Sequence, residues 1–477
     1  MKFLKALLIS ALIILIAASA AGCGSEVKKV KLDPENPEVV TIWHYYNGSV
    51  ANAFDAVVNE FNETVGAKMG IIVEDYSMGG ISELENEVIA SANKEIGSDK
   101  LPNIFASYAD IAYEVDTKGL LANLDEYITQ KELNEYIDSY IEEGRIGANG
   151  ELRIFPIAKS TEVLMLNDTD WLPFAAENGL TYDDLATLEG LTRASELYYN
   201  WSGGKAFSGR DSAANLFLIT SKAAGTEIFK VSGGKCDINI NRDVMRKIWD
   251  NFYVPYISGY FTSFGKFRSD DAKLGLLLSY VGSTASAAYF PKEVTEGDVS
   301  RAVETKVLPA PGFEGADKTL VQQGAGMVVT KSTPQAEYAS LMFLKWFTDT
   351  EINIEFCVKS GYTPVKKEAI NFDKAIALAE EKGIPVDGVT EETLRVAFAE
   401  IQNSEMYTNK AFKHSADARK ILENDLQSKA SGDREQILGF IDGGKSLNEA
   451  VGAFNTDEAF DQWLSDFTVK LNDTLYR

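Results

Sequence analysis

The sequence predicts an α/β protein made of two sheet-and-helix regions that are closely joined. Across residues 39–107, apolar runs with strand character alternate with segments that carry one apolar face at helical spacing. A second apolar strand, at residues 163–166, begins a stretch in which the same alternation resumes. No long linker separates the two regions, and 477 residues are enough for two or three domains. We therefore expect each region to fold as a sheet flanked by helices.

Three strands are expected in the first region, at residues 39–43, 70–73 and 103–107. The first intervening segment places Val50 and Phe54 on one helical face, and the second does the same with Leu84 and Val88. Such repetition is typical of a parallel sheet, where ligands bind beyond the C-terminal strand ends. Those ends carry a group of aromatic and polar side chains: Trp43, His44, Tyr45, Tyr46, Asn47, Tyr76, Tyr108 and Asp110.

The second region and the C-terminal part contain further helices and strands. Asp211 is expected to cap a helix that runs to Ala224. A helix from Arg242 should end before Pro255, because proline lacks the backbone N–H that a helix interior needs. The other expected elements are strands at 274–281, 306–311 and 324–330, and helices at 333–347, 366–382, 390–403, 415–430 and 457–471.

The N-terminus resembles a bacterial lipoprotein signal. Lys2 and Lys5 give a basic start, residues 6–18 are almost entirely apolar, and small residues lead to Cys23. The apolar run is shorter than the ~20 residues that a membrane span needs. The resemblance implies that residues 1–22 are removed, that Cys23 is lipidated, and that residues 23–38 form a tether at the cell membrane. An ordinary cleaved signal with a chance cysteine is the alternative.

Composition excludes several functional classes. The net charge is −25, from 71 acidic and 46 basic residues, which opposes nucleic-acid binding. The chain has 2 His residues, so a His-rich metal site is nearly excluded, and we expect neither a metal nor a cofactor. Beyond Cys23 there are Cys236 and Cys357, which make no disulfide framework and are expected as two packed thiols. No second long apolar run follows the signal, so the mature part is expected to be soluble.

No motif identifies a catalytic residue. The patterns Gly-x-Ser-x-Gly and His-Glu-x-x-His are absent, and the acidic residues are too numerous to single out a glycosidase pair. Residues 439–446 match the phosphate-loop pattern G-x-x-x-x-G-K-[ST], but no apolar strand leads into them. We instead expect a turn between two helices, in which Ser446 caps the second helix.

The aromatic side chains at the strand ends favour a sugar ligand. A flat ring suits the C–H-rich face of a sugar, and nearby Asn, Asp or Arg side chains can bond its hydroxyls. Each aromatic residue taken singly is more often part of a core, and His44 alone is expected as a hydrogen-bonded structural residue. Clustering at one sheet edge singles out Trp43, Tyr45 and Asp110 as ligand-binding candidates.

Several short motifs follow one another in a set order. They occupy residues 41–48, 101–105, 150–158, 281–283, 323–327, 343–347 and 360–365. In this order, behind a lipoprotein-type signal, they resemble the extracellular solute-binding proteins of ABC transporters, family 1. That family includes maltodextrin-, multiple-sugar- and glycerol-phosphate-binding proteins. The resemblance runs from about Val39 to the end, with Asn103 in place of the common Asp.

This resemblance implies a two-lobe α/β fold of the periplasmic-binding-protein type (type II), in which hinge motion closes the lobes on a ligand. Chain crossings are expected near Pro156, Leu308 and Pro364. Residues 39–156 and 308–363 would then form the N-lobe, and residues 157–307 and 364–477 the C-lobe. Carried over to this sequence, the resemblance and the strand-end pattern give the expected ligand-binding residues: Trp43, His44, Tyr45, Tyr46, Asn47, Tyr76, Asp110, Ser160, Thr161, Trp201, Arg210, Asp211, Gly282, Ser283, Thr284 and Tyr362.

The function implied is that of a non-catalytic, lipid-anchored, extracytoplasmic protein, a monomer that captures a carbohydrate-like solute and delivers it to an ABC permease. The maltodextrin type has a stacking Trp near Thr284 that this chain lacks, so a long glucan is disfavoured. Glycerol phosphate, another anion or a short peptide is the alternative ligand, with Lys159, Arg210 and Lys413 as candidate cations. An exported glycoside hydrolase and a surface adhesin are the rival functions.

Overall fold

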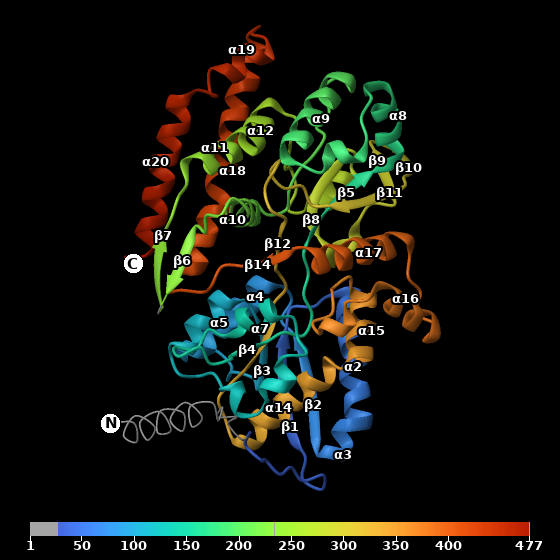
Figure 1. Cartoon of the computed structure of the whole chain (residues 1–477), viewed down its shortest axis with the longest axis vertical. Helices are drawn as coiled ribbons and strands as arrows, with labels where there is room; N and C mark the ends of the chain where they lie inside the picture. The colour runs from blue at the N-terminus through green and yellow to red at the C-terminus, as the bar shows by residue number, and fades with distance from the viewer. Residues whose placement is uncertain (1–26, 233, 477) are drawn as a thin grey trace, which may run out of the picture.

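The computed structural model describes residues 27–232 and 234–476, and it consists of two lobes stacked along the long axis (Figure 1). Each lobe has its own sheet with helices around it, so the predicted α/β architecture is confirmed. Within the described residues, no helix is both long and apolar enough to span a membrane. Cys23 and the expected signal lie outside the described residues.

The first lobe contains a five-stranded sheet of order β2-β1-β3-β13-β4. β1 pairs in parallel with β2 and with β3, as the sequence predicts, whereas β13 runs antiparallel to both of its neighbours, β3 and β4. The elements of this lobe are β1 Glu38–His44, α2 Gly48–Phe61, α3 Ala67–Met69, β2 Ile71–Ser77, α4 Ile81–Asn93, β3 Ile104–Ser107, α5 Ala109–Asp116, α6 Gln130–Leu133, α7 Asp138–Gly144, β4 Ile154–Phe155, β13 Gly326–Val329, α14 Pro334–Phe347, α15 Thr350–Ser360 and α16 Phe372–Glu381.

The second lobe is built on an antiparallel sheet of order β11-β5-β8. Its first elements are β5 Glu162–Asn167, α8 Asp168–Asn178, α9 Leu188–Trp201, α10 Ala213–Ala223, β6 Phe229–Ser232, β7 Lys235–Ile238, α11 Arg242–Ile248, α12 Val254–Ser258, α13 Arg268–Lys273, β8 Ser279–Ser283, β9 Glu293–Glu296, β10 Val299–Ala302 and β11 Thr305–Pro309. The C-terminal helices α18 Ser415–Asp442, α19 Leu447–Gly452 and α20 Asp457–Thr474 complete it.

Short elements join the lobes. β12 (Thr319–Val321) pairs in parallel with β14 (Glu405–Tyr407), and α17 (Gly388–Asn403) packs between the lobes, against β11 of the second (Figure 1). The buried residues between Val365 and Met406 belong to the first core, and Phe412 belongs to the second. The lobe boundaries stay a prediction, and this packing favours a last crossing after Met406 rather than near Pro364.

Each lobe is stabilised by its own hydrophobic core, and both cores are rich in aromatic rings. In the first, Phe54 and Phe61 of α2 meet Phe343 of α14. In the second, Trp249 meets Trp463 of α20. Large rings bury much apolar area each, and this burial is the main favourable term in folding.

Two helix ends lie at other positions than the sequence suggested, for reasons of local hydrogen bonding. Asp211 is not the cap of α10, because the Ser212 hydroxyl accepts the Asn215 N–H at 3.2 Å and Asp211 accepts the Arg268 N–H instead. The helix from Arg242 does not end before Pro255. It widens into a π-helical turn, Trp249–Tyr253, and Pro255 lies in the first turn of α12, where its missing N–H costs little.

Other expectations agree with the structure or differ in extent. Thr333 caps α14 with Pro334 at its start, and the strand expected at 274–281 begins only at Ser279 because α13 and the Gly275 turn precede it. Helix α18 continues past Ala430 to Asp442, where the buried Asp433 accepts hydrogen bonds from Tyr253 and Lys429. Cys236 and Cys357 are both free thiols.

Candidate binding site between the lobes

Four tyrosines from separate parts of the chain form one group, here called the tyrosine cluster. Tyr45 and Tyr46 follow β1, Tyr108 follows β3, and Tyr362 follows α15. The hydroxyls of Tyr45 and Tyr362 lie 3.2 Å apart, and the Tyr46 and Tyr362 rings are 6.1 Å apart, edge to face. Burial raises the pKa of all of them, that of Tyr108 to about 12, so their hydroxyls stay neutral donors at neutral pH.

Charged groups from both lobes surround Tyr108. Arg419 of α18 opposes the rise in the pKa of Tyr108, whereas Glu85, Glu143 and Asp110 add to it. Burial, followed by the negative charge of Asp110, raises the pKa of Glu85 to about 7. Because Arg419 belongs to the second lobe and the acids to the first, the tyrosine cluster lies where the two lobes face each other.

The facing surface of the second lobe is a hydrogen-bonded network. The buried Arg210 donates to Glu162 at 2.6 Å, and Asn215 donates to the same carboxylate at 2.9 Å. Asn215 also donates to Gln323 at 3.1 Å and accepts from Arg419 at 2.7 Å. Arg210 is therefore already paired, which leaves Arg419 as the guanidinium that reaches toward the tyrosine cluster.

The connections between the lobes carry several of the expected site residues. Ser160 pairs with Gln323 through backbone hydrogen bonds, and the Thr284 N–H donates to the Thr161 carbonyl at 2.9 Å. The buried Lys159 donates to Glu143 of α7 at 2.6 Å and to the Gly324 carbonyl at 2.8 Å. These contacts hold the hinge strands together and leave Lys159 unavailable to an anion.

Gly282, Ser283 and Asp211 lie together at the end of β8. A Cβ at Gly282 would come within 2.8 Å of the Asp211 carboxylate, so glycine is needed for this close approach. The Ser283 hydroxyl accepts the Ala285 N–H at 3.2 Å and begins the short helix Thr284–Tyr289. Tyr289, at the end of that helix, comes near Gly48 of the first lobe.

Four expected site residues lie elsewhere. Trp43 and Tyr76 line a separate groove beside β1 and β2 of the first lobe. Trp201 packs on Phe174 and donates to Glu177 in the second lobe. Asn47 is exposed and donates to the carbonyls of Tyr45 and Gly79. Trp43 and Tyr76 are register partners on β1 and β2, so their side chains lie on the same face of the sheet, and both line the separate groove.

One group of side chains has the composition of a metal site. Ligand atoms of His44, Asp55 and Asp75 all lie within 4.8 Å of one another. However, the Tyr46 N–H donates to Nδ1 of His44, so Nε2 carries the proton and donates to Asp75 at 3.2 Å. That bond lowers the pKa of Asp75, while burial and the Asp75 carboxylate raise that of Asp55. The group fits a proton-bridged structural cluster, as expected for His44, and not a metal site, because no ring nitrogen is free.

The segment that matches the phosphate-loop pattern is a helix end. Residues 439–442 close α18, Gly444 takes a left-handed conformation, and Ser446 caps α19 with Glu449 in a reciprocal capping box. No strand precedes it, so the turn predicted from the sequence is confirmed.

Sequence reasoning missed Glu85, Arg419, Asn215 and Gln323 as site residues. Glu85 and Arg419 lie on helices with polar faces, where a functional charge resembles any solvated one. Gln323 belongs to a motif noted in the sequence, and its position before Gly324 was the available signal.

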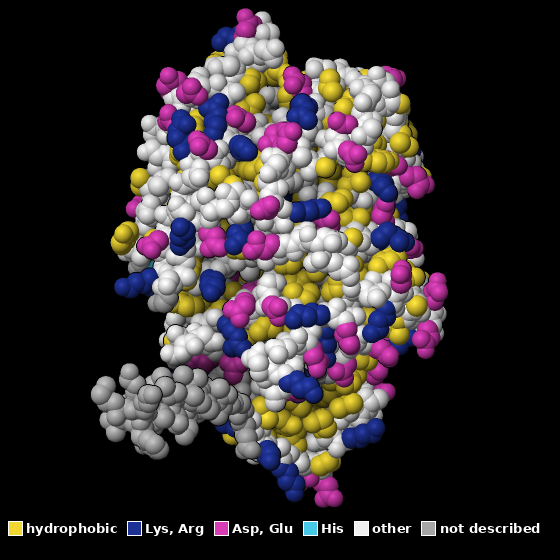
Figure 2. Space-filling view, viewed as in Figure 1, with side chains coloured by type: hydrophobic (Ala, Val, Ile, Leu, Met, Phe, Trp, Pro, Cys, Tyr) yellow, Lys and Arg dark blue, Asp and Glu magenta, His cyan; other side chains and the backbone are white. Residues whose placement is uncertain are grey.

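A groove of about 1100 Å³ lies between the lobes beside the hinge. The first lobe contributes Tyr113 of α5 and Glu143 of α7, and the second contributes Phe229 of β6 and Ala411. Figure 2 shows acidic and basic side chains interspersed over the visible face. The lobes therefore enclose free space where they meet.

The amino-acid sequence was compared with models of protein families and with curated proteins. The family model described as bacterial extracellular solute-binding protein matches residues 56–382. No curated protein sequence matches the chain.

Solved structures with the same fold cover nearly the whole chain. The cyclic α-maltosyl-1,6-maltose binding protein from Arthrobacter globiformis has a TM-score of 0.65 at 19% identity, covering 92% of this chain and 99% of that one. UgpB from Mycobacterium tuberculosis, in complex with glycerophosphocholine, has a TM-score of 0.64 at 17% identity, covering 92% and 100%. Maltose-bound MalE3 of T. maritima has a TM-score of 0.59 at 13% identity, covering 90% and 99%. These likenesses bear out the expected two-lobe, periplasmic-binding-protein type of fold.

Proposed function

Because the chain belongs to the bacterial extracellular solute-binding proteins, we propose that it captures a carbohydrate-like solute between its lobes and delivers it to the permease of an ABC importer. The family consists of binding proteins and not of enzymes, so the alternative of an exported glycoside hydrolase is dropped. A protein that presents its solute to a permease works at the outer side of the cell membrane, in agreement with an extracellular family.

The tyrosine cluster is the observation that carries the proposed ligand class. Tyr45 and Tyr108 are only partly buried, and a neutral phenol group offers both a flat face for a sugar ring and a hydroxyl for hydrogen bonding. Tyr46 and Tyr362 are buried in the first core and support these two rings from behind. Asp110 lies at the start of α5 beside Tyr108, and it can accept hydrogen bonds from sugar hydroxyls. Two of the structural neighbours are named or described as binding maltose or a maltose derivative, which supports the same class.

Closure of the lobes would follow from differential affinity. A solute that touches Tyr108 from one side and Arg419 from the other makes all its contacts only in the closed form, so it shifts the population toward closure. The permease then recognises the closed, loaded protein.

The test begins with a thermal-shift screen of sugars, and the best ligand is then titrated by calorimetry. Tyr45→Ala and Asp110→Ala should each weaken binding of that sugar by roughly tenfold, because each removes a ring contact or charge-assisted hydrogen bonds. The control is Trp201→Ala, which removes an aromatic side chain of the second lobe far from the cluster. Unchanged affinity in both site variants would refute the assignment.

Arg419 supports a second candidate, a ligand with an anionic group such as a glycerol phosphodiester. Its guanidinium lies near Tyr108, and the neighbour UgpB is described in complex with glycerophosphocholine. Lys159 and Arg210 support this ligand less, since each is paired with a carboxylate. Arg419→Gln should abolish binding of an anionic ligand but weaken binding of a neutral sugar only a few fold.

We further propose that Cys23 anchors the protein through lipid at the membrane. Cells grown with labelled palmitate should incorporate it into the wild-type protein and not into Cys23→Ala. Equal labelling of the two would point to attachment elsewhere.

A further inference from the structure

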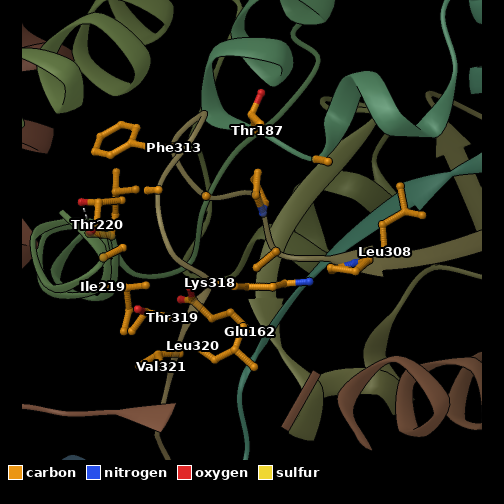
Figure 3. Close-up of a pocket in the computed structure, with 18 of the residues that line it drawn as sticks. Glu162, Thr187, Ile219, Thr220, Leu308, Phe313, Lys318, Thr319, Leu320 and Val321 are labelled. Carbon is orange, nitrogen blue, oxygen red and sulfur yellow. Dashed lines mark hydrogen bonds between the residues drawn. The ribbon is translucent and has the colours of Figure 1, made fainter. Parts of the chain in front are cut away.

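A second cavity lies in the second lobe, next to the hinge connections. Its volume is about 430 Å³, within the range of small-molecule pockets. Figure 3 shows it between α10, which contributes Ile219 and Thr220, and the segments that carry Leu308, Phe313 and Leu320. Thr161 and Arg210, which the sequence suggested as solute-binding residues, line this cavity, but none of the tyrosine cluster does, so the cavity is distinct from the solute site proposed at that cluster.

The walls of this hinge cavity are mainly apolar, whereas one side is polar and buried. Glu162 and Arg210 line it as an ion pair, with side chains 7% and 8% exposed. Thr161 also lines it, is fully buried, and has a hydroxyl without a hydrogen-bond partner among the described residues. A buried hydroxyl without a partner is costly, so a ligand that supplies one gains free energy there.

We propose that the hinge cavity is a second small-molecule site, for a neutral and mainly apolar compound that carries a hydroxyl group, such as an aryl or alicyclic alcohol. The Glu162–Arg210 pair compensates its own charge, Lys318 is paired with Glu400, and the lining residues Asp183 and Asp317 are exposed to solvent, which together favour a neutral ligand over an ion. The apolar walls bind the ring, and Thr161 exchanges a hydrogen bond with the ligand hydroxyl.

The position of this site couples it to the hinge. Thr161 and Glu162 belong to the first connection between the lobes, and β12 belongs to the second. An occupant would touch both connections at once and so favour the lobe arrangement in which they are correctly spaced. By linkage, the hinge ligand and the cleft solute then change each other's affinity by the same factor.

The first experiment uses the wild-type protein with ¹³C-labelled isoleucine methyl groups. Benzyl alcohol is the probe, and toluene, which lacks the hydroxyl, is its matched control. Benzyl alcohol should shift the Ile219 signal with saturation, and toluene should bind about threefold to tenfold more weakly, the cost of one neutral hydrogen bond. Shifts at other isoleucines without any at Ile219, or no saturation, would overturn the proposal.

Two variants test the assignment independently. Thr161→Val keeps the side-chain shape and should remove the preference for benzyl alcohol over toluene. Ile219→Trp fills the cavity and should abolish saturable binding of both, whereas Val469→Trp, exposed on α20, should bind like the wild type. Wild-type affinity in Ile219→Trp would contradict the proposal.

These measurements do not depend on the proposed solute. They are made without a sugar, and Tyr45→Ala should leave benzyl alcohol binding unchanged. Failure of benzyl alcohol binding would remove the hinge site alone, whereas failure of every sugar in the thermal-shift screen would remove the proposed ligand class alone.

Discussion

The pKa of a single side chain, Glu85, depends on its burial and on charges from both lobes. Glu85 lies on α4, where burial and Asp110 raise its pKa to about 7 and Lys420 of the second lobe opposes the rise. A carboxyl whose pKa is raised on folding binds its proton more tightly in the folded state. Its contribution to stability is therefore complete below about pH 4.5 and is lost as the pH rises to about 7.

Replacing Glu85 by Gln should remove this loss. We expect Glu85→Gln to be more stable than the wild type at pH 8, by on the order of 1–3 kcal/mol, and nearly equal to it at pH 4.5. Denaturant unfolding at the two pH values measures the difference. Glu95→Gln, near the end of α4, is the control, and an equal gain at both pH values would show that the charge is not the cause.

At the scale of secondary-structure elements, a buried ion pair fastens the connection between the lobes that contains Lys159. Lys159 and Glu143 are 2% and 8% exposed, and they connect the segment between β4 and β5 with α7. Removing one partner of such a pair leaves the other as an uncompensated buried charge, which costs far more than an exposed pair is worth.

Lys159→Met should therefore destabilise the protein by about 3–5 kcal/mol, whereas the double variant Lys159→Met, Glu143→Gln should recover much of that loss. The control is Lys205→Met, whose pair with Glu296 is exposed and should cost at most ~1 kcal/mol. Chemical denaturation followed by tryptophan fluorescence reports the free energies. A similar small effect for both single variants would contradict the role given to the buried pair.

At the scale of the whole molecule, one glycine sets how closely the lobes approach. Gly361 of the first lobe has φ of 75°, and a Cβ there would lie 2.9 Å from the Thr284 carbonyl oxygen of the second lobe. The absence of a side chain at this position thus lets the two halves touch beside the tyrosine cluster.

Gly361→Ala should hold the lobes apart and weaken solute binding by roughly tenfold or more, with a larger radius of gyration by small-angle X-ray scattering in the presence of solute. Gly383→Ala is a matched control, because Gly383 has φ of 66° but nothing near its Cβ position, so it shares the backbone strain without the clash. Equal effects of the two substitutions would assign the loss to strain and not to closure.

The sequence predicted the features that depend on local pattern. Helical spacing of apolar residues, the helix expected from Thr333 onward and the three parallel strands of the first lobe follow from side-chain periodicity and local residue preferences, and each is present. Tyr45, Tyr46 and Asp110 were expected near the site because parallel strands end at one edge of a sheet, whereas Tyr362 was expected only from the family resemblance. The sequence could not tell whether Trp43 and Tyr76 face the site, because the face on which a strand residue is useful depends on what covers the sheet.

Only the tertiary structure decided which charges meet. Glu85 and Asp110 are close in sequence, but Arg419 comes from α18, more than three hundred residues later, and its approach depends on how the lobes stack. The hinge cavity likewise exists only where segments from β5, α10 and the 308–321 connection fail to fill the space between them. Periodicity is a property of neighbours along the chain, whereas charge pairing and cavity shape are set by contacts between distant segments, and no local pattern encodes them.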